Sequence, residues 1–153
     1  NRTSCSAAAA AVIVLTLASG LAVAQQPAAA PAQTITRAGE QTSIAGPAEY
    51  FTGRARIDPV WPADQNINAS GGLVTFGLAR SAWHTHPAGQ HLVVISGVGR
   101  TQEWSKPIQE IRPGDVVWCP PGVKHWHGAG PATAMTHLSV AGRGADGKNV
   151  NWM

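Results

Sequence analysis

Residues 83–91, with the sequence WHTHPAGQH, contain the pattern that decides the fold. Successive side chains of a β-strand point to opposite faces, so His84 and His86 share one face if this stretch is extended. Pro-Ala-Gly at 87–89 predicts a tight turn, after which a second strand begins. The residues that alternation places on the inner face of this second strand are Gln90, Leu92 and Val94. The stretch therefore predicts two strands that carry two imidazoles and an amide into the interior of a barrel.

A second stretch, residues 120–127 with the sequence PPGVKHWH, repeats this pattern. Pro-Pro-Gly predicts a turn, and His125 and His127 share one face of the strand that follows. Either pair alone is more often part of a core or a surface than a metal site. Imidazole nitrogens bind Mn, Fe, Co, Ni, Cu and Zn, and an amide oxygen such as that of Gln90 widens the choice toward Mn and Fe. The two stretches together predict a metal site.

The rest of the chain consists of short β-type runs separated by turns, and the 17 Gly and 11 Pro favour turns over long helices. No convincing amphipathic helix and no internal repeat is found. The spacing of the runs predicts an all-β fold, an antiparallel sandwich or barrel. The expected strands cover residues 73–78, 82–86, 91–96, 99–104, 108–112, 116–119, 124–128 and 134–140.

The N-terminal part of the chain differs from the rest in composition. Residues 1–24 have the features of a signal peptide: Arg2, an apolar stretch, and Ala22-Val23-Ala24 as a cleavage site. An uncleaved membrane anchor is the alternative, although the apolar run is short for a span. Residues 25–36 predict a flexible linker and 37–153 a single domain. We therefore expect a periplasmic or secreted protein without a stable membrane anchor after cleavage. The chain opens on Asn1, so its natural start is expected upstream.

Charge and cysteine content narrow the function classes. Charged residues make up 12% of the chain, the net charge is +3, and the Lys and Arg residues are scattered. Nucleic acid is therefore not an expected partner. Cys119 is the one thiol that remains after signal removal, so no internal disulfide is expected, and we expect it to be a buried apolar residue.

Several spacings around the two histidine stretches resemble the two motifs of metal-binding cupins. Six residues separate Gln90 from Gly97, Gly114 precedes Pro120 by six positions, and Gly122 stands three before the first histidine of the second stretch. The resemblance covers residues 37–153 and implies a single cupin β-barrel, a double-stranded β-helix or jelly roll. The metal ligands that it implies are His84, His86, Gln90 and His125.

Three positions depart from the general cupin pattern. Gln90 stands where cupins usually have Glu, Ala129 where Asn often ends the second motif, and Leu78 where Gly is expected, with Gly77 one step earlier. A barrel that has lost its metal is the alternative that these departures raise. With three His and an amide as ligands, a divalent ion would keep its full charge and act as a stronger Lewis acid.

More specifically, the chain resembles small bacterial cupins with manganese-dependent hydroxynitrile lyase activity, in which Gln also occupies the fourth ligand position. The matching stretches are 50–53, 56–59, 82–87, 89–90, 113–118, 124–129 and 134–138. The resemblance implies a lyase that cleaves or forms cyanohydrins with Mn²⁺, with Fe²⁺, Ni²⁺ or Zn²⁺ as alternatives. It also implies that His137 and His127 act as acid and base. The alternative role of these two histidines is to orient the metal ligands by hydrogen bonds or to form hydrogen bonds within the core.

Two other functions remain open at this point: a cupin dioxygenase-type oxidoreductase, and a non-catalytic periplasmic cupin that binds a metal or a small ligand. In each case a small molecule is the expected partner, and by analogy with small cupins we expect a homodimer or homotetramer.

The sequence also leads to expectations for six residues outside the predicted site. We expect His91 to face away from the site and the three tryptophans Trp83, Trp118 and Trp126 to pack around the barrel, with a substrate-stacking wall as the alternative. Arg80 and Lys124 are expected to be solvated surface charges, with attraction of an anion toward the mouth as the alternative.

Overall fold

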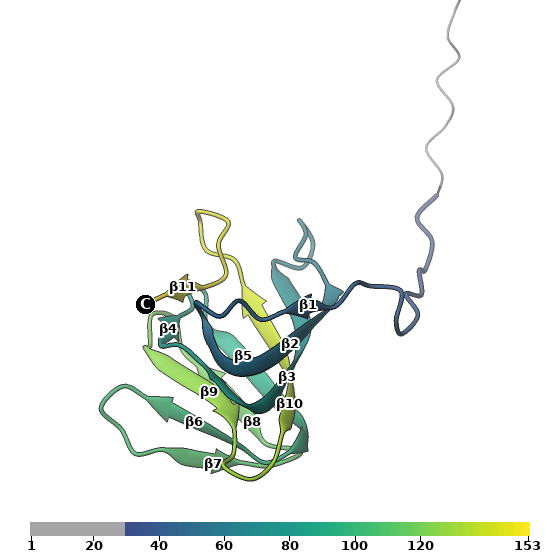
Figure 1. The fold of residues 1–153 in the computed structure, drawn as a ribbon. Helices are drawn as coiled ribbons and strands as arrows, with labels where there is room; N and C mark the ends of the chain where they lie inside the picture. Colours follow the sequence, from purple (N-terminus) through teal and green to yellow (C-terminus); the bar gives the residue numbers. More distant parts are fainter. Residues whose placement is uncertain (1–29) are drawn as a thin grey trace, which may run out of the picture. The chain divides into compact units, whose positions relative to one another are not determined.

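The histidine stretches lie in a curled antiparallel sheet. A computed structural model describes residues 30–153, and Thr36–Met153 form one compact unit. The predicted signal peptide, residues 1–24, and the first part of the predicted linker, residues 25–29, lie outside the described residues. Within them there is no helix, and accordingly none that is long and apolar enough to cross a membrane. The predicted all-β cupin barrel is confirmed (Figure 1).

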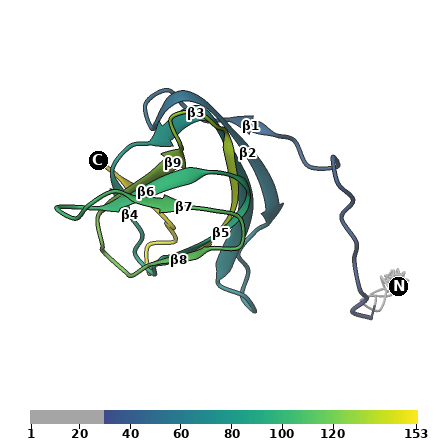
Figure 2. The same ribbon diagram turned by 90° about the horizontal axis from the view of Figure 1, so that it is seen from below.

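Residues 30–153 contribute eleven strands. They are β1 (Ile44–Ala45), β2 (Phe51–Trp61), β3 (Ala69–Ser81), β4 (His84–Thr85), β5 (Gln90–Gly97), β6 (Gly99–Glu103), β7 (Gln109–Ile111), β8 (Val116–Cys119), β9 (His125–Ala129), β10 (Met135–Gly142) and β11 (Asn151–Trp152). The main path of the sheet runs β11-β4-β9-β3-β10-β5-β8, all pairs antiparallel. The pairs β1–β2 and β6–β7 extend it through β3 and β9. Figure 2 shows from below how the strands curl around a common interior.

The eight strands predicted between residues 73 and 140 are all present; the strand at 116–119 has the predicted bounds and the other seven have shifted ends. Strands β1, β2 and β11 were missed. Strand β2 was not predicted because its 11 residues contain Gly53, Arg54 and Pro59. The short β1 pairs with β2 at Arg56 and Ile57 only, so Pro59 lies beyond that pairing. On its other side Pro59 pairs with Gly72 of β3, next to an irregularity in the register between Pro59 and Trp61, and strands tolerate proline at such irregular positions.

Strand β3 begins at Ala69, earlier than predicted. Its first residues were not predicted because Gly71 and Gly72 are of a type that is uncommon in strands. At Gly71 a Cβ atom would lie 2.5 Å from the ring of Trp61, so only glycine lets this tryptophan pack against β3. The motif glycine Gly97 has a φ of +77°, and a Cβ atom there would lie 1.9 Å from the carbonyl oxygen of Ala134. Gly97 therefore allows the close approach between the end of β5 and the start of β10.

One hydrophobic core supports the barrel beside the histidines. Phe76 and Met135 are fully buried and face each other across the pair β3–β10. The predicted inner face of β5 is confirmed, since Gln90, Leu92 and Val94 are buried and His91 is exposed. The buried members of the core cluster are Phe51, Ala55, Phe76, Ala79, Val94, Ile111 and Met135.

Candidate metal centre

The structure brings all six predicted site residues to the interior of the barrel, although they come from separate strands. The first motif supplies His84 on β4, His86 directly after it, and Gln90 at the start of β5. The second supplies His125 and His127 on β9, and β10 adds His137. Strand β4 pairs with β9 at His84 and His125, which sets the two motifs side by side. All six side chains are buried.

Three of the histidines have the same hydrogen-bond arrangement. In His84 and His125 the Nδ1–H donates to the backbone carbonyl two residues earlier, at 2.8 and 2.9 Å. In His86 the Nδ1–H donates to the carbonyl of Asn149. Because an Nδ1 that donates carries the proton, the lone pair of each ring is left on Nε2. Metal-binding histidines are oriented by outer partners in this way.

The rings of these three histidines converge. The ring centroids of His84 and His125 are 4.4 Å apart, those of His84 and His86 5.1 Å, and those of His86 and His125 5.5 Å. Gln90 donates its amide Nε2 to the hydroxyl of Ser139 at 2.9 Å. The amide oxygen is thereby turned inward, where it lies 3.4 Å from Nε2 of His125.

A tighter subset of the ring nitrogens differs from the predicted ligand set. His84, His125 and His127 each offer one nitrogen, and these atoms lie within 4.8 Å of one another. His127 thus lies as close to the cluster centre as an expected ligand, although sequence reasoning made it an acid/base candidate. Its Nδ1 has no hydrogen-bond partner within the described part of the chain, unlike Nδ1 of His84 and His125. Strand alternation predicted this proximity, because His127 follows His125 by two residues.

Burial sets the charge state of these imidazoles. Desolvation, with the nearby His125 and His86 adding to it, lowers the pKa of His84 to about 3. Desolvation also lowers the pKa of His86 and of His137 to about 4, and it lowers the pKa of His125. The site is therefore a set of neutral imidazoles at pH 7, with lone pairs available for a metal or a proton.

His137 and His127 lie deeper than the three convergent rings. Burial takes the pKa of His127 well below its ordinary value, and His137 adds to the effect. Their ring centroids are 4.9 Å apart, and both rings pack against Phe76 at 5.7 to 5.8 Å. Neither ring nitrogen of His137 has a hydrogen-bond partner among residues 30–153. Buried polar atoms are rarely left so, and both nitrogens are available to a water or a small molecule at this position.

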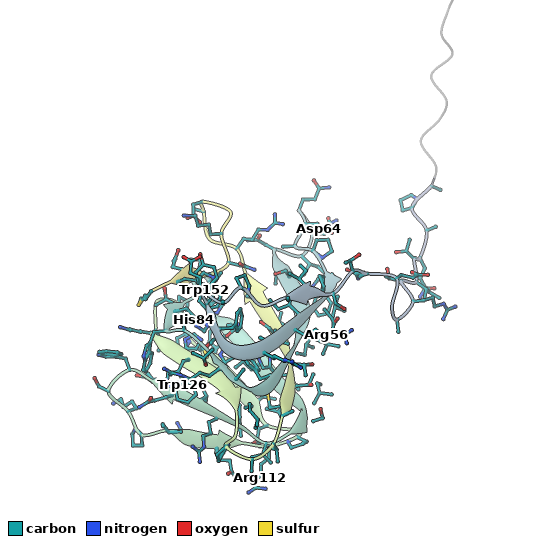
Figure 3. All side chains as sticks on the ribbon, viewed as in Figure 1. Arg56, Asp64, His84, Arg112, Trp126 and Trp152 are labelled. Atoms are coloured by element: carbon teal, nitrogen blue, oxygen red, sulfur yellow. The ribbon has the colours of Figure 1, made fainter. Side chains whose placement is uncertain are left out.

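A cavity of about 510 Å³ opens onto these residues. Its polar wall includes His84, His86, Gln90, His127 and His137. Its opposite side is largely apolar and comes from β2, β3 and the C-terminal segment. The lining residues that the sequence analysis did not identify include Phe51, Ile57, Trp61, Val74, Asn149 and Trp152. Figure 3 shows Trp152 and His84 close together, and their ring centroids are 4.7 Å apart.

Other singled-out residues lie away from the cavity. His91 is exposed and stacks on Trp118 at 4.4 Å, as expected for a residue facing outward. Trp83 and Trp126 pack edge-to-face at 6.5 Å, and none of the three predicted tryptophans lines the cavity. The substrate-stacking alternative for these tryptophans is therefore wrong. The aromatic residues at the cavity are others, Trp61 and Trp152 among them.

The remaining candidates have structural surroundings. The guanidinium of Arg80 lies 4.7 Å from the ring centroid of Trp126, and the ammonium of Lys124 lies 3.6 Å from that of Trp104. Neither side chain lines the cavity, so neither stands at its mouth. Cys119 is buried as expected, and desolvation raises the pKa of its thiol to about 12, which makes it a poor nucleophile.

Comparison with known proteins gives a consistent result. Residues 74–140 match the model of the Cupin_2 family, described as "Cupin domain". A protein of Granulicella tundricola named (R)-mandelonitrile lyase is 54% identical over 120 residues, covering 78% of this chain and 91% of that protein. The crystal structure of a cupin-like protein from Thermotoga maritima is 34% identical, covers 79% of this chain and 89% of its own, and has a TM-score of 0.64.

A cupin-2 domain from Rhodospirillum rubrum shares the fold at 14% identity, with a TM-score of 0.63 over 81% of this chain and 82% of that one. Family match, barrel topology and histidine cluster agree with one another. The chain therefore belongs to the cupin family, as a small cupin that resembles the hydroxynitrile lyase-like members and has histidines positioned to bind a divalent metal.

Proposed function

We propose that this protein is a metal-dependent lyase that cleaves cyanohydrins to an aldehyde and hydrogen cyanide, and forms them in reverse. The observation that carries the proposal is the set of three convergent imidazoles whose Nδ1 atoms are each bonded to a backbone carbonyl. The relative named (R)-mandelonitrile lyase, 54% identical over 78% of this chain, supports the choice of reaction.

The residues fit a divalent ion at this position. His84, His86 and His125 would bind it through Nε2, and Gln90 through its amide oxygen. In His86 this Nε2 is buried without a hydrogen-bond partner in the described part of the chain, as expected of an atom reserved for a ligand. When bound, the ion would supply Lewis-acid chemistry toward a cyanohydrin oxygen. We propose Mn²⁺, because the amide carbonyl oxygen of Gln90 favours it, whereas imidazoles alone would favour Fe²⁺, Ni²⁺ or Zn²⁺.

His137 and His127 handle the proton in this proposal. A neutral imidazole of His137 accepts the cyanohydrin's hydroxyl proton, and the electrons of that O–H bond form the carbonyl. The bond between the carbinol carbon and the nitrile carbon breaks, and cyanide leaves with its electron pair. The imidazolium then returns the proton to cyanide, which departs as hydrogen cyanide. His127, whose ring lies 4.9 Å away, is the second residue able to hold this proton.

The cavity suits a substrate with one polar and one apolar end. Its volume of about 510 Å³ falls within the roughly 300–1,000 Å³ common for small-molecule sites. The histidines occupy one side, while Phe51, Trp61 and Trp152 contribute to the other. An aryl cyanohydrin would place its hydroxyl and nitrile toward the histidines and its ring toward these aromatic side chains.

Two measurements test the proposal together. The metal content of protein purified without added metal should show a transition metal near one equivalent, and the manganese-loaded protein should release benzaldehyde from mandelonitrile. His137→Ala should keep the metal and lower kcat by roughly 10²–10⁴-fold, the usual contribution of acid–base catalysis. His91→Ala, on the outer surface, is the matched control.

The competing functions give different results in the same experiment. Oxygen uptake by an iron-loaded sample, without mandelonitrile cleavage, would replace the lyase with a dioxygenase-type oxidoreductase. Metal binding without turnover of either kind would leave a binding protein. A protein that takes up no transition metal at any loading would contradict the proposed site itself.

A further inference from the structure

We infer that the C-terminal segment, residues 149–153, positions the metal-binding histidines, and in particular that it sets the orientation of His86. This inference rests on the proposed metal-dependent function. It concerns residues that lie beyond the stretch matched by the family model, which ends at residue 140.

His86 differs from the other two convergent histidines in where its hydrogen-bond acceptor comes from. His84 and His125 donate to carbonyls two residues earlier in the chain, just before their strands begin. His86 donates to the carbonyl of Asn149, which is 63 residues away in the sequence. The ring orientation of His86 therefore depends on a tertiary contact, whereas the other two rings are oriented by local backbone.

The Asn149 peptide is itself held in place. Its side-chain Nδ2 donates to the hydroxyl of Ser70 on β3 at 3.1 Å. Just before it, the chain turns sharply, with Gly144 N donating to the carbonyl of Lys148 at 2.8 Å. A series of contacts thus runs from β3 through Asn149 to His86.

The end of the segment contacts the other histidine of the first motif, His84. Strand β11 pairs with β4, with Trp152 opposite His84, and the two strands lie beside each other in Figure 1. The Trp152 ring stacks on Tyr50 at 4.6 Å and contacts Phe51 edge-on at 5.6 Å. The ring centroids of Trp152 and His84 are 4.7 Å apart. Trp152 therefore packs between the hydrophobic core and the histidine site.

Outer partners of metal-binding histidines orient the ring and raise its basicity, and their loss typically costs 10–100-fold in metal affinity. A chain that ends at Lys148 should therefore bind Mn²⁺ about 10–100-fold more weakly than the full chain. Ser70→Ala should lower the affinity about threefold to tenfold, because it removes only the anchor of Asn149. Ser70→Thr keeps the hydroxyl and should restore affinity.

The experiment compares dissociation constants for Mn²⁺, measured by competition with a chelator, across the full chain and these variants. Ser96→Ala is the matched control, since Ser96 is exposed on β5 and the same change there lies outside the C-terminal segment and the cavity. A second readout needs no metal. The ¹⁵N spectrum of the metal-free full chain should show His86 protonated at Nδ1, and Ser70→Ala and the shortened chain should each reduce that population.

Unchanged affinity together with an unchanged His86 spectrum in Ser70→Ala and the shortened chain would overturn the inference. That holds even if the shortened chain is less stable, because Ser70→Ala leaves every residue of the segment in place. A full chain that binds no metal overturns the proposed function instead, which separates the two failures.

Discussion

The polar and the apolar side of the cavity come from stretches with different sequence patterns. The polar side comes from β4, β5 and β9, where His84, Gln90 and His127 follow short, regular spacings along the chain. The apolar side comes from β2 and the C-terminal segment, where Trp61 and Trp152 belong to no such spacing.

The difference shows what each side demands of its residues. A metal site needs specific atoms at fixed distances, so only a few residue types satisfy it and the pattern is visible in one sequence. An apolar wall needs only surface of the right size, which many residues supply. The polar side should therefore be sensitive to single changes and to pH, and the apolar side should respond in substrate binding alone.

The largest expected effect is the loss of folding stability when the metal-free protein is acidified. Burial depresses the pKa of His84 to about 3 and of His86 and His137 to about 4. The unfolded chain, with pKa values near 6.5, takes up protons that the folded chain excludes. The stability that comes from these pKa differences is fully present above pH 6.5. It is lost as pH falls toward 4, at roughly 1.4 kcal/mol per pH unit for each such histidine.

Urea unfolding at pH 7, 6 and 5 measures this loss of stability. His137→Phe removes one of the buried imidazoles and should flatten the dependence. A free energy of unfolding that stays constant from pH 7 to 5 would mean that these imidazoles are not buried as neutral groups.

The apolar support behind the polar wall gives the second prediction. Phe76 is fully buried and its ring contacts both His127 and His137. Phe76→Ala should lower the free energy of unfolding by about 3–5 kcal/mol, the usual cost of emptying such a site. Denaturant unfolding checks this value against Ile108→Ala, which is 50% exposed and should change by less than about 0.5 kcal/mol.

Removal of a predicted ligand should have the next largest effect. His84→Ala should weaken Mn²⁺ binding by more than about 100-fold, beyond the 10–100-fold that loss of an outer partner costs. Isothermal titration calorimetry measures the change, and His91→Ala, on the outward face of β5, should match the unchanged protein. The two variants should be indistinguishable only if His84 is not a ligand.

His127 allows a sharper test of the ligand set. If His127 is an acid/base group, His127→Ala should retain metal affinity within about threefold and lose activity. If it belongs with His84 and His125 as a ligand, affinity should fall as far as it does in His84→Ala. The same calorimetric titration distinguishes these two outcomes.

The smallest effect is expected on the apolar side. Trp61→Ala should raise KM for mandelonitrile about tenfold, equivalent to about 1.4 kcal/mol, and leave kcat within a factor of about two. An aliphatic cyanohydrin, which has no ring to place there, should show little change. Trp118→Ala is the control, because that ring lies outside the cavity, on the surface. A fall in kcat without a rise in KM would argue against this wall as a binding surface.

The parts of the fold that have a local signal in the sequence were predicted correctly. Alternation around residues 83–91 and 120–127 predicted the inward side chains of two strands, and every predicted strand between 73 and 140 exists. Strand β2 was missed because Pro59 and alternating charges obscure its strand pattern. Strand β3 was predicted to begin at residue 73 but begins at Ala69, and the residues missed include Gly71 and Gly72. Both glycines read as breaks, yet Gly71 is where Trp61 packs.

By itself the sequence determined the chemistry of the site: which imidazoles and which amide turn inward. The reason is that strand alternation and turn geometry act over a few residues. Tertiary structure alone decided that Asn149 would orient His86 and that Trp61 and Trp152 would line the cavity opposite the histidines. These contacts join residues from distant strands, and their partners are chosen by how the whole barrel closes rather than by any local pattern.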